Sequence, residues 1–374
     1  MPPPVPPVAA SDASDVIEFD LHGIVGVRAI GAMPADAAAL ARQLGPTAAP
    51  LDRAPDIVIR YVDRLAVSGT VQLLGLNDAG FTDDAFLVLG ADYRAKPRTQ
   101  IALQQVGGTV EMVCEHHVGA VPLLTAVANL TALAKGVLPL HGAAFEHRGI
   151  GVVTTGWSKG GKTESLLAFT AHGARYVGDE WIYLIDQGAQ VRGFPEPITA
   201  WDWQLREVPR YRASLPRGTR ARLSVITRFE SLEPVVPQRV FRRVMPFLKN
   251  RHNADLDPRV LFGSAATDPK CSFDRLFYVA SHESPAITVD PIGGDEVAAR
   301  MTYSLRFERL RFMDYYLKFR FAFPDLASPL VEEADDFERN LLKVALAGKP
   351  TYVVRHPYPC SLDALYEAMR PFCD

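Results

Sequence analysis

The segment that most limits how this chain can fold is residues 156–163, which read Gly-Trp-Ser-Lys-Gly-Gly-Lys-Thr. The spacing is G-x-x-x-x-G-K-T. Residues 151–155 before it are a short run rich in β-branched side chains, and residues 163–171 after it have the apolar spacing of a helix. Strand, glycine-rich loop and helix in this order are what the spacing requires. We therefore expect an α/β fold organised around this turn.

Each residue type in the segment suits a polyphosphate. Glycines let backbone N–H groups converge on phosphate oxygens, and the following helix presents its positive end to the same anion. Lys162 can reach the β- and γ-phosphates, and the Thr163 hydroxyl can bind Mg²⁺. The segment therefore predicts a Walker A site, or P-loop, for a nucleoside triphosphate and Mg²⁺. The residues expected to bind the nucleotide are Gly156, Trp157, Ser158, Lys159, Gly160, Gly161, Lys162, Thr163 and Glu164.

Two acidic residues, Asp179 and Glu180, follow one short apolar strand and precede another. Asp179 lies sixteen residues after Thr163, a distance that one helix, a turn and a strand fill. The pair is therefore expected at the carboxyl edge of the sheet, beside the phosphates. There one carboxylate can hold Mg²⁺ and the other can accept a proton from an attacking hydroxyl. The alternative is an acidic pair that only caps a turn.

A histidine, His141, stands just before the strand that leads into the glycine-rich segment, in the sequence Leu-His-Gly-Ala-Ala. A lone histidine is more often a packed or surface residue than a catalytic one. Taken by itself, His141 is a candidate only because of its place in the chain.

Together, these motifs resemble the carboxy-terminal catalytic domain of HPr kinase/phosphorylase, a bacterial serine kinase family whose nucleotide fold is related to phosphoenolpyruvate (PEP) carboxykinase. The likeness covers His141-Gly142, the loop ending in Lys162-Thr163-Glu164, and Gly178-Asp179-Glu180, across residues 140–184. It implies that Asp179 is the general base, that Glu180 serves the metal together with Thr163 and Asp179, and that His141 lies near the transferred phosphate. It also implies ATP as the nucleotide and Lys162 as a catalytic residue.

The chain differs from the family pattern at three points. Lys159 replaces the middle glycine of the loop, Glu180 replaces a second aspartate, and the family's Arg-Gly-Leu-Gly-Ile-Ile signature is missing. These differences favour a related kinase with an acceptor other than HPr, such as a serine in a peptide or protein, or a hydroxyl of a small molecule.

The expected fold is α/β, a P-loop kinase core of the HPr kinase/PEP carboxykinase type preceded by a small β-rich domain. Residues 1–14 are rich in proline and predict a disordered tail. Residues 15–118 contain short apolar runs at 57–62, 70–76, 85–89, 99–106 and 108–114, which predict an antiparallel meander, with a helix at 34–44. Residues 119–374 are expected to form the catalytic domain. It is expected to begin with a core helix and a strand within 120–140, and late helices are expected at about 295–323, 334–347 and 362–369.

A basic insertion is expected at about 206–260 in the catalytic domain. Its residues 206–259 contain twelve Arg and one Lys against five acidic residues, a net charge of +8. A solvated surface insertion and a lid or docking surface for an acidic substrate explain this excess equally well. Arg242 and Arg243 are the candidate substrate-binding residues.

The composition limits the partners. A formal net charge of −3 is too weak to favour nucleic acid or a membrane as the main partner, and a homo-oligomer is compatible with it. The four cysteines form neither a C-x-x-C pair nor a zinc-binding spacing, which indicates reduced thiols in a cytoplasmic protein. The longest apolar stretch, 120–140, is interrupted by Asn129 and Lys135 and reads as core rather than as a membrane span.

The sequence thus predicts an ATP- and Mg²⁺-dependent kinase, and other classes remain open. A motor or transport ATPase would use Asp179 and Glu180 as a Walker B pair, but such a pair usually lies farther along the chain. A nucleotide-binding regulator would keep the loop without phosphotransfer. A GTPase is disfavoured because the chain lacks Asn-Lys-x-Asp, and carboxykinase chemistry because no His, Lys and Asp cluster for a transition metal is visible.

Overall fold

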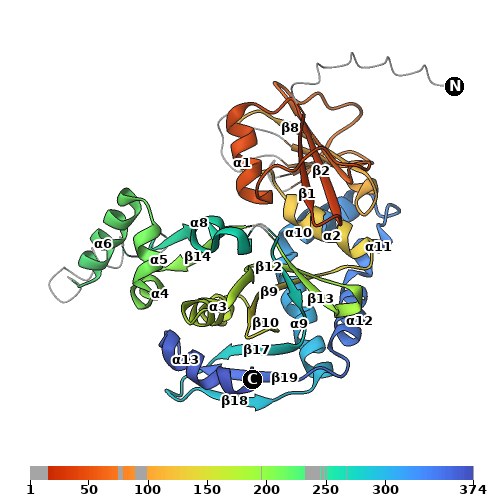
Figure 1. Ribbon diagram of the computed structural model, residues 1–374. Coiled ribbons are helices and arrows are strands. Elements are labelled where there is room, and N and C mark those ends of the chain that lie inside the picture. The colour runs from red at the N-terminus through yellow and green to blue at the C-terminus, as the bar shows by residue number, and fades with distance from the viewer. Residues whose placement is uncertain are drawn as a thin grey trace. The chain divides into compact units, whose positions relative to one another are not determined.

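The computed structural model shows a mixed α/β protein (Figure 1). It describes residues 16–74, 79–88, 99–194, 196–231, 245, 248, 251–266 and 268–373. The chain divides into two compact units, Met1–Lys135 with Arg311–Glu332, and Gly136–Leu310 with Glu333–Asp374. The expected tail at 1–14 and the candidates Arg242 and Arg243 lie outside the described residues.

The division between the units differs from the expected one. The sequence predicts a second domain that begins at residue 119, whereas the second unit begins at Gly136. The reason is that helix α2 (Leu124–Ala134) packs against elements of the first unit, strand β2 (Val25–Ile30) and helix α11 (Pro329–Glu332).

The first unit is built on a mixed sheet that, within the described residues, has the strand order β1-β2-β3-β8-β7-β6-β5-β4. The other strands of this sheet are β1 Val16–Leu21, β3 Ile57–Val62, β4 Gln72–Leu74, β5 Ala79–Phe81, β6 Ala85–Val88, β7 Thr99–Ala102 and β8 Val110–Glu115, and the other helices of the unit are α1 Pro34–Leu44 and α10 Leu310–Ala322. Phe81 and Phe86 pack edge-to-face with Phe319 of α10 and bind the late helix to this sheet.

The predicted antiparallel meander is correct for β8-β7-β6-β5-β4 and wrong for β3. Strand β3 pairs parallel with both β2 and β8. Helix α1 connects β2 to β3, and a helical crossover returns the chain in the same direction, which gives a parallel pair.

The second unit has a sheet whose order, in the described part of the chain, is β16-β13-β12-β9-β10-β17-β19-β18, with β11 also paired to β9. Its strands are β9 Leu138–His147, β10 Ile150–Gly156, β11 Arg175–Gly178, β12 Trp181–Ile185, β13 Gln190–Gly193, β16 Lys270–Ser272, β17 Arg275–Ser281, β18 Thr288–Pro291 and β19 Thr351–His356. Only β10-β17 and β17-β19 among these pairs are parallel. The helix and strand predicted within residues 120–140 are confirmed by α2 and the start of β9.

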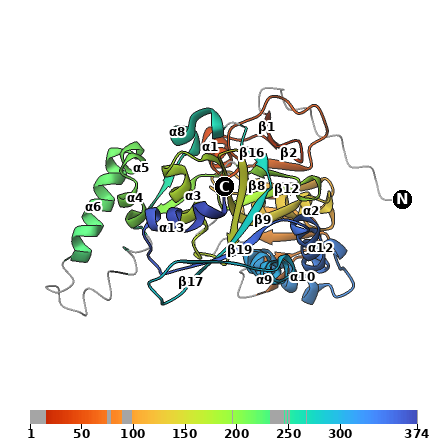
Figure 2. The same cartoon turned by 60° about the horizontal axis from the view of Figure 1, so that its bottom comes forward.

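Helices cover both faces of this sheet (Figures 1 and 2). The apolar core on one face joins β9 and β10 to α3 (Lys162–Ala171) and α13 (Leu362–Met369). The core on the other face joins the same strands to α9 (Gly294–Glu308) and α12 (Ala334–Leu346). The second unit is therefore a layer of strands between two layers of helices.

The late helices agree with the sequence except at one break. The helices predicted at 334–347 and 362–369 are α12 and α13. The single helix predicted at 295–323 is two helices, α9 and α10, which separate at Arg309. The Arg309 guanidinium is buried and pairs with Asp335 and Glu338 of α12, which fixes the chain where α9 ends.

The basic insertion leaves the second unit through a two-stranded ribbon, β14 (Ile198–Trp201) paired with β15 (Asn253–Leu256). Its described helices are α4 Asp202–Glu207, α5 Pro209–Ser214 and α6 Arg217–Ser231, and α8 Pro258–Phe262 follows the ribbon. The Asp202 amide donates to the His252 carbonyl oxygen at 3.0 Å, which ties the two ends of the insertion together.

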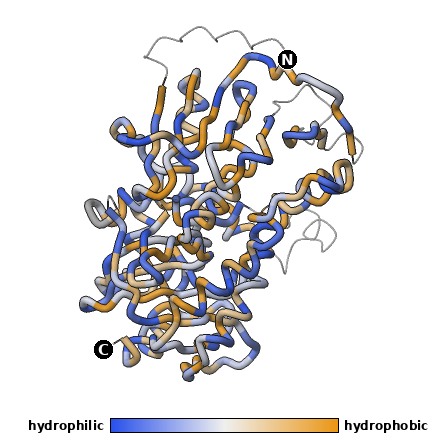
Figure 3. Tube along the Cα trace, turned by 90° about the vertical axis from the view of Figure 1, so that its right-hand side faces the viewer, coloured by the Kyte–Doolittle hydropathy of each residue, from blue (hydrophilic) through white to orange (hydrophobic). Residues whose placement is uncertain are grey.

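Hydrophobic and hydrophilic stretches are interleaved along the trace (Figure 3). None of the helices in the described residues combines the length and the apolar character that crossing a bilayer requires.

We expect Phe169→Ala to destabilise the second unit by about 3–5 kcal/mol, because it removes a large buried ring from α3. Phe169 is fully buried and stacks on Phe145 of β9 with ring centroids 4.4 Å apart. Denaturant unfolding followed by circular dichroism measures the change. Phe337→Ala is the matched control, since that ring is 46% exposed on α12 and its loss should cost under about 0.5 kcal/mol. Equal losses in the two variants would contradict the assigned core.

Candidate functional site

The glycine-rich segment forms a loop, residues 157–161, between the end of β10 and the start of α3. Gly161, the residue before the helix, has φ of 114°, a conformation that side chains disfavour. A Cβ at Gly161 would lie 2.2 Å from Nε2 of the buried His356, and the same nitrogen lies 2.9 Å from the Gly160 carbonyl oxygen. The end of β19 thus packs directly against the loop. The strand, loop and helix expected from the sequence are confirmed.

The first turn of α3 presents its backbone N–H groups to the loop. The residue before the helix, Gly161, has no side chain that could cap it, which favours the binding of an anion to the first amides of the helix. Lys162 is the first residue of the helix and is only 5% exposed. Its Nζ atom donates to the Trp157 carbonyl oxygen at 3.0 Å, which folds the side chain back over the loop.

The electrostatic surroundings of Lys162 are mixed. Burial lowers the pKa of this ammonium, although four carboxylates, those of Glu180, Asp179, Glu308 and Glu164, act in the opposite direction. The cation therefore lies in an acidic environment and is held over a loop of backbone donors.

Asp179 meets Thr163 across the site. The Thr163 hydroxyl donates to the Asp179 carboxylate, with Oγ1 at 3.0 Å from Oδ2 and 3.2 Å from Oδ1. Asp179 directly follows β11 and is only 1% exposed. Burial raises the pKa of Asp179, and the adjacent Glu180 charge raises it further. The turn between β11 and β12 thus brings the acidic residue to the amino end of α3, as the sequence predicts.

His141 lies between two carboxylates. Its Nε2 atom lies 3.2 Å from Glu180 Oε2, at hydrogen-bond distance. Its Nδ1 atom lies 2.9 Å from Glu308 Oε1 and forms an ion pair whose geometry is not that of a hydrogen bond. Burial lowers the pKa of the imidazole, but the contacts with Glu180 and Glu308 outweigh burial and the net effect is a raised pKa. The pKa of Glu180 is shifted in the opposite direction, because the hydrogen bond with His141 lowers it.

Most of these side chains line one cavity of about 350 Å³. The lining residues that the sequence predicts are His141, Ser158, Lys159, Gly160, Gly161, Lys162, Thr163, Glu164 and Glu180. The predicted Gly156 ends β10, and Trp157 is 48% exposed and packs against Phe307 of α9. Asp179 lies behind Thr163, in contact with its hydroxyl. One site therefore gathers residues from β9, the loop, α3 and the turn before β12.

Several residues at this site have no recognisable signal in the sequence. Glu308 lies at the end of α9, far along the chain from His141, and nothing in its neighbours suggests a role. Thr199, Trp201, Gln204, Asn253 and Tyr358 line the rest of the cavity. Trp201 and Tyr358 supply aromatic surface in the cavity that the glycine-rich loop also lines. Burial raises the pKa of the Glu164 carboxyl, and the nearby Gln204 side chain of α4 acts in the opposite direction.

No protein-family model matches the sequence, and no curated protein matches it significantly. The function of this chain therefore has to be inferred from its own residues and their contacts.

We expect the His141 imidazole of the metal-free protein to have a pKa above its ordinary value of about 6.5, and Glu308→Gln to lower it. Because the pKa of His141 is higher in the folded than in the unfolded protein, these contacts contribute fully to the free energy of unfolding below pH of about 6.5. The contribution is lost as the pH rises through the pKa of the folded protein. Titration of ¹³C-labelled histidine by NMR measures the shift, with His141→Gln identifying the signal. Glu296→Gln on the same helix is the control and should leave the signal unmoved. A His141 pKa unaffected by Glu308→Gln would contradict the ion pair.

Proposed function

We propose that the protein is an ATP- and Mg²⁺-dependent kinase related to HPr kinase/phosphorylase, with a P-loop core of the HPr kinase/PEP carboxykinase type. The acceptor in this proposal is a hydroxyl, either of a serine in a peptide or protein or of a small molecule. The observation that carries the proposal is the contact of Thr163 with Asp179 at 3.0 Å, at the amino end of α3. It joins the two motifs that phosphoryl transfer needs, a phosphate-binding loop and a carboxylate, although they are separate in the sequence.

The donor set fits Mg²⁺. Thr163 and Asp179 offer a hydroxyl and a carboxylate within hydrogen-bond distance, and Glu180 lies next to them. Mg²⁺ prefers oxygen ligands and usually binds through one or two carboxylates together with substrate phosphates and water. Among the described residues no group of three His, Cys, Asp or Glu forms a self-contained metal site, so the phosphates would complete the shell. The bound cation would supply neutralisation of the charge on the β- and γ-phosphates.

The residues of the chain divide the remaining tasks. The loop amides and the amino end of α3 hold the phosphates, and Lys162 exchanges its bond to the Trp157 carbonyl for phosphate oxygens. Asp179 accepts the proton of the acceptor hydroxyl as the phosphoryl group transfers in line. His141, held by Glu180 and Glu308, faces the same cavity and donates to the transferred group.

The alternative is a nucleotide-binding regulator, or an ATPase, that keeps the loop without an external acceptor. Incubation with γ-labelled ATP and Mg²⁺ in lysate of the source cells separates these classes, once the labelled molecules are identified. A kinase labels a specific acceptor. Tight ATP binding with no labelled acceptor would favour the regulator, and release of labelled phosphate alone would favour the ATPase.

Lys162→Ala should lower phosphoryl transfer by roughly 10²–10³, about 3–4 kcal/mol, because it removes a buried cation from the developing charge. Transfer of label from ATP under saturating nucleotide measures it. Lys343→Ala, which removes an exposed lysine on α12, is the charge-matched control. Near-normal transfer in Lys162→Ala would show that this loop is not the catalytic centre.

Asp179→Asn should leave nucleotide binding largely intact while transfer falls by roughly 10²–10⁴, since an amide cannot accept the acceptor proton. The amide oxygen still accepts the Thr163 hydrogen bond, so the local fold should persist. Calorimetry with a non-hydrolysable ATP analogue and label transfer measure the two effects separately. Asp336→Asn, on the surface of α12, is the control, and full turnover in Asp179→Asn would remove this residue as the base.

A further inference from the structure

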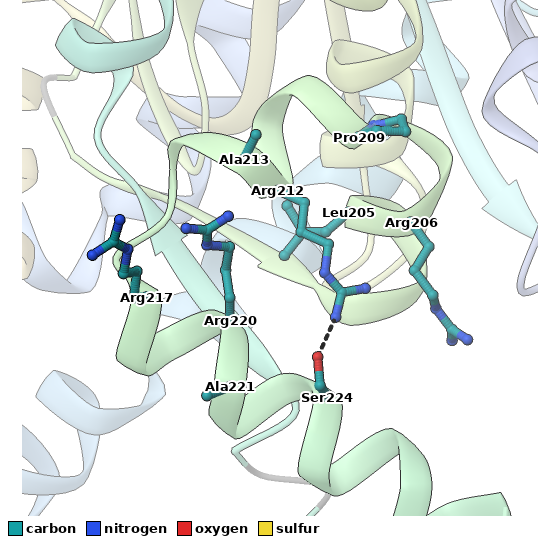
Figure 4. Close-up of a pocket in the computed structure, with 9 residues that line it drawn as sticks. All are labelled: Leu205, Arg206, Pro209, Arg212, Ala213, Arg217, Arg220, Ala221 and Ser224. Atoms are coloured by element: carbon teal, nitrogen blue, oxygen red, sulfur yellow. Dashed lines mark hydrogen bonds between the residues drawn. The ribbon is translucent and has the colours of Figure 1, made fainter.

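A second pocket, of about 550 Å³, lies inside the basic insertion between α4, α5 and α6 (Figure 4). We call it the arginine pocket. Its lining residues are Leu205, Arg206, Pro209, Arg212, Ala213, Arg217, Arg220, Ala221 and Ser224. Four of the nine are arginines, and none is acidic. Figure 4 shows that Arg217 and Arg220 project from α6, while Arg212 reaches from α5 to Ser224.

Only part of this positive charge is balanced by the chain. The fully buried Asp202 carboxylate pairs with Arg206 at 3.2 Å and with Arg212 at 3.1 Å. Asp202 also accepts a hydrogen bond from Thr227, so its oxygens are already engaged. One carboxylate thus serves two of the four guanidinium groups.

Arg217 and Arg220 have no acidic partner among the described residues. The Nε atom of Arg220 is buried and makes no hydrogen bond within that part of the chain. A buried guanidinium donor without an acceptor is costly, and an anion that binds there removes the cost.

The shape and the chemistry of the pocket indicate the class of ligand. Guanidinium groups bind phosphate through paired, parallel hydrogen bonds. A concave site of this volume suits a small molecule, and Leu205, Pro209, Ala213 and Ala221 give it apolar walls. Three uncompensated positive charges, four arginines less Asp202, match a multiply charged anion.

We propose that the arginine pocket binds a small phosphate-bearing molecule at a site separate from the glycine-rich loop. Helix α4 separates the two sites, because Gln204 lines the nucleotide cavity and Leu205 and Arg206 line the arginine pocket. The binding does not depend on kinase activity, so it survives if the proposed function fails.

Titration calorimetry of the full-length protein with pyrophosphate tests the proposal. The Lys162→Ala variant weakens the loop site and leaves the arginine pocket as the main binding site. Adding Arg217→Ala and Arg220→Ala to that variant should raise the remaining Kd at least tenfold. Arg217→Lys with Arg220→Lys should give an intermediate Kd, because lysine keeps the positive charge but cannot form the paired, parallel hydrogen bonds of a guanidinium group.

Arg228→Ala with Lys343→Ala is the matched control, since it removes the same charge at exposed positions that do not line the pocket. Circular dichroism checks that α6 persists in every variant. An unchanged Kd in the Arg217/Arg220 variant, or an equal loss in the control, would overturn the site. If citrate bound as tightly as pyrophosphate at equal ionic strength, the ligand would not need to bear phosphate. If a short oligonucleotide bound more tightly through the same arginines, the ligand would not be a small molecule.

Discussion

The candidate site depends on one buried carboxylate and the hydroxyl that it faces. Asp179 is almost completely enclosed, and an isolated charge in such a place is strongly disfavoured. The Thr163 hydroxyl lies within hydrogen-bond distance of both oxygens, and it comes from the first turn of α3, where the backbone amides also point. The helix, the loop and the turn after β11 are therefore fixed relative to one another by a contact that is most favourable when a cation or proton is present.

The two neighbouring carboxylates, Asp179 and Glu180, have opposite surroundings. Burial raises the pKa of Asp179, while the hydrogen bond with His141 lowers that of Glu180. Glu180 has φ of 62°, an uncommon conformation for this residue type, and its side chain contacts His141 of β9. Adjacent acidic residues whose pKa values are shifted in opposite directions are a recurrent arrangement in sites where one group transfers a proton and the other stays ionised.

The parts of the molecule that could be predicted from the sequence are those whose signals are local. The strand, loop and helix around residues 156–163 follow from glycine spacing and apolar periodicity, and the sixteen residues from Thr163 to Asp179 fit one helix, a turn and a strand. Strand order was not predictable in the same way, because β3 pairs with β2 and β8 through contacts far apart in the chain. Glu308 was missed for the same reason, since only the packing of α9 on the sheet brings it to His141.

The basic insertion contributes residues to both pockets. Its ends are tied by β14, β15 and the hydrogen bond from Asp202 to His252, and α4 follows directly. Trp201 and Gln204 line the cavity beside the glycine-rich loop, whereas Asp202 holds Arg206 and Arg212 at the arginine pocket. One short helix thus contributes to both pockets, and Gln204 of this helix also lies close enough to Glu164, in the first turn of α3, to lower the pKa of its carboxyl against the larger effect of burial. Of the four arginines, Arg206 and Arg212 are therefore fixed by the buried Asp202 at the start of α4, whereas Arg217 and Arg220 project from α6.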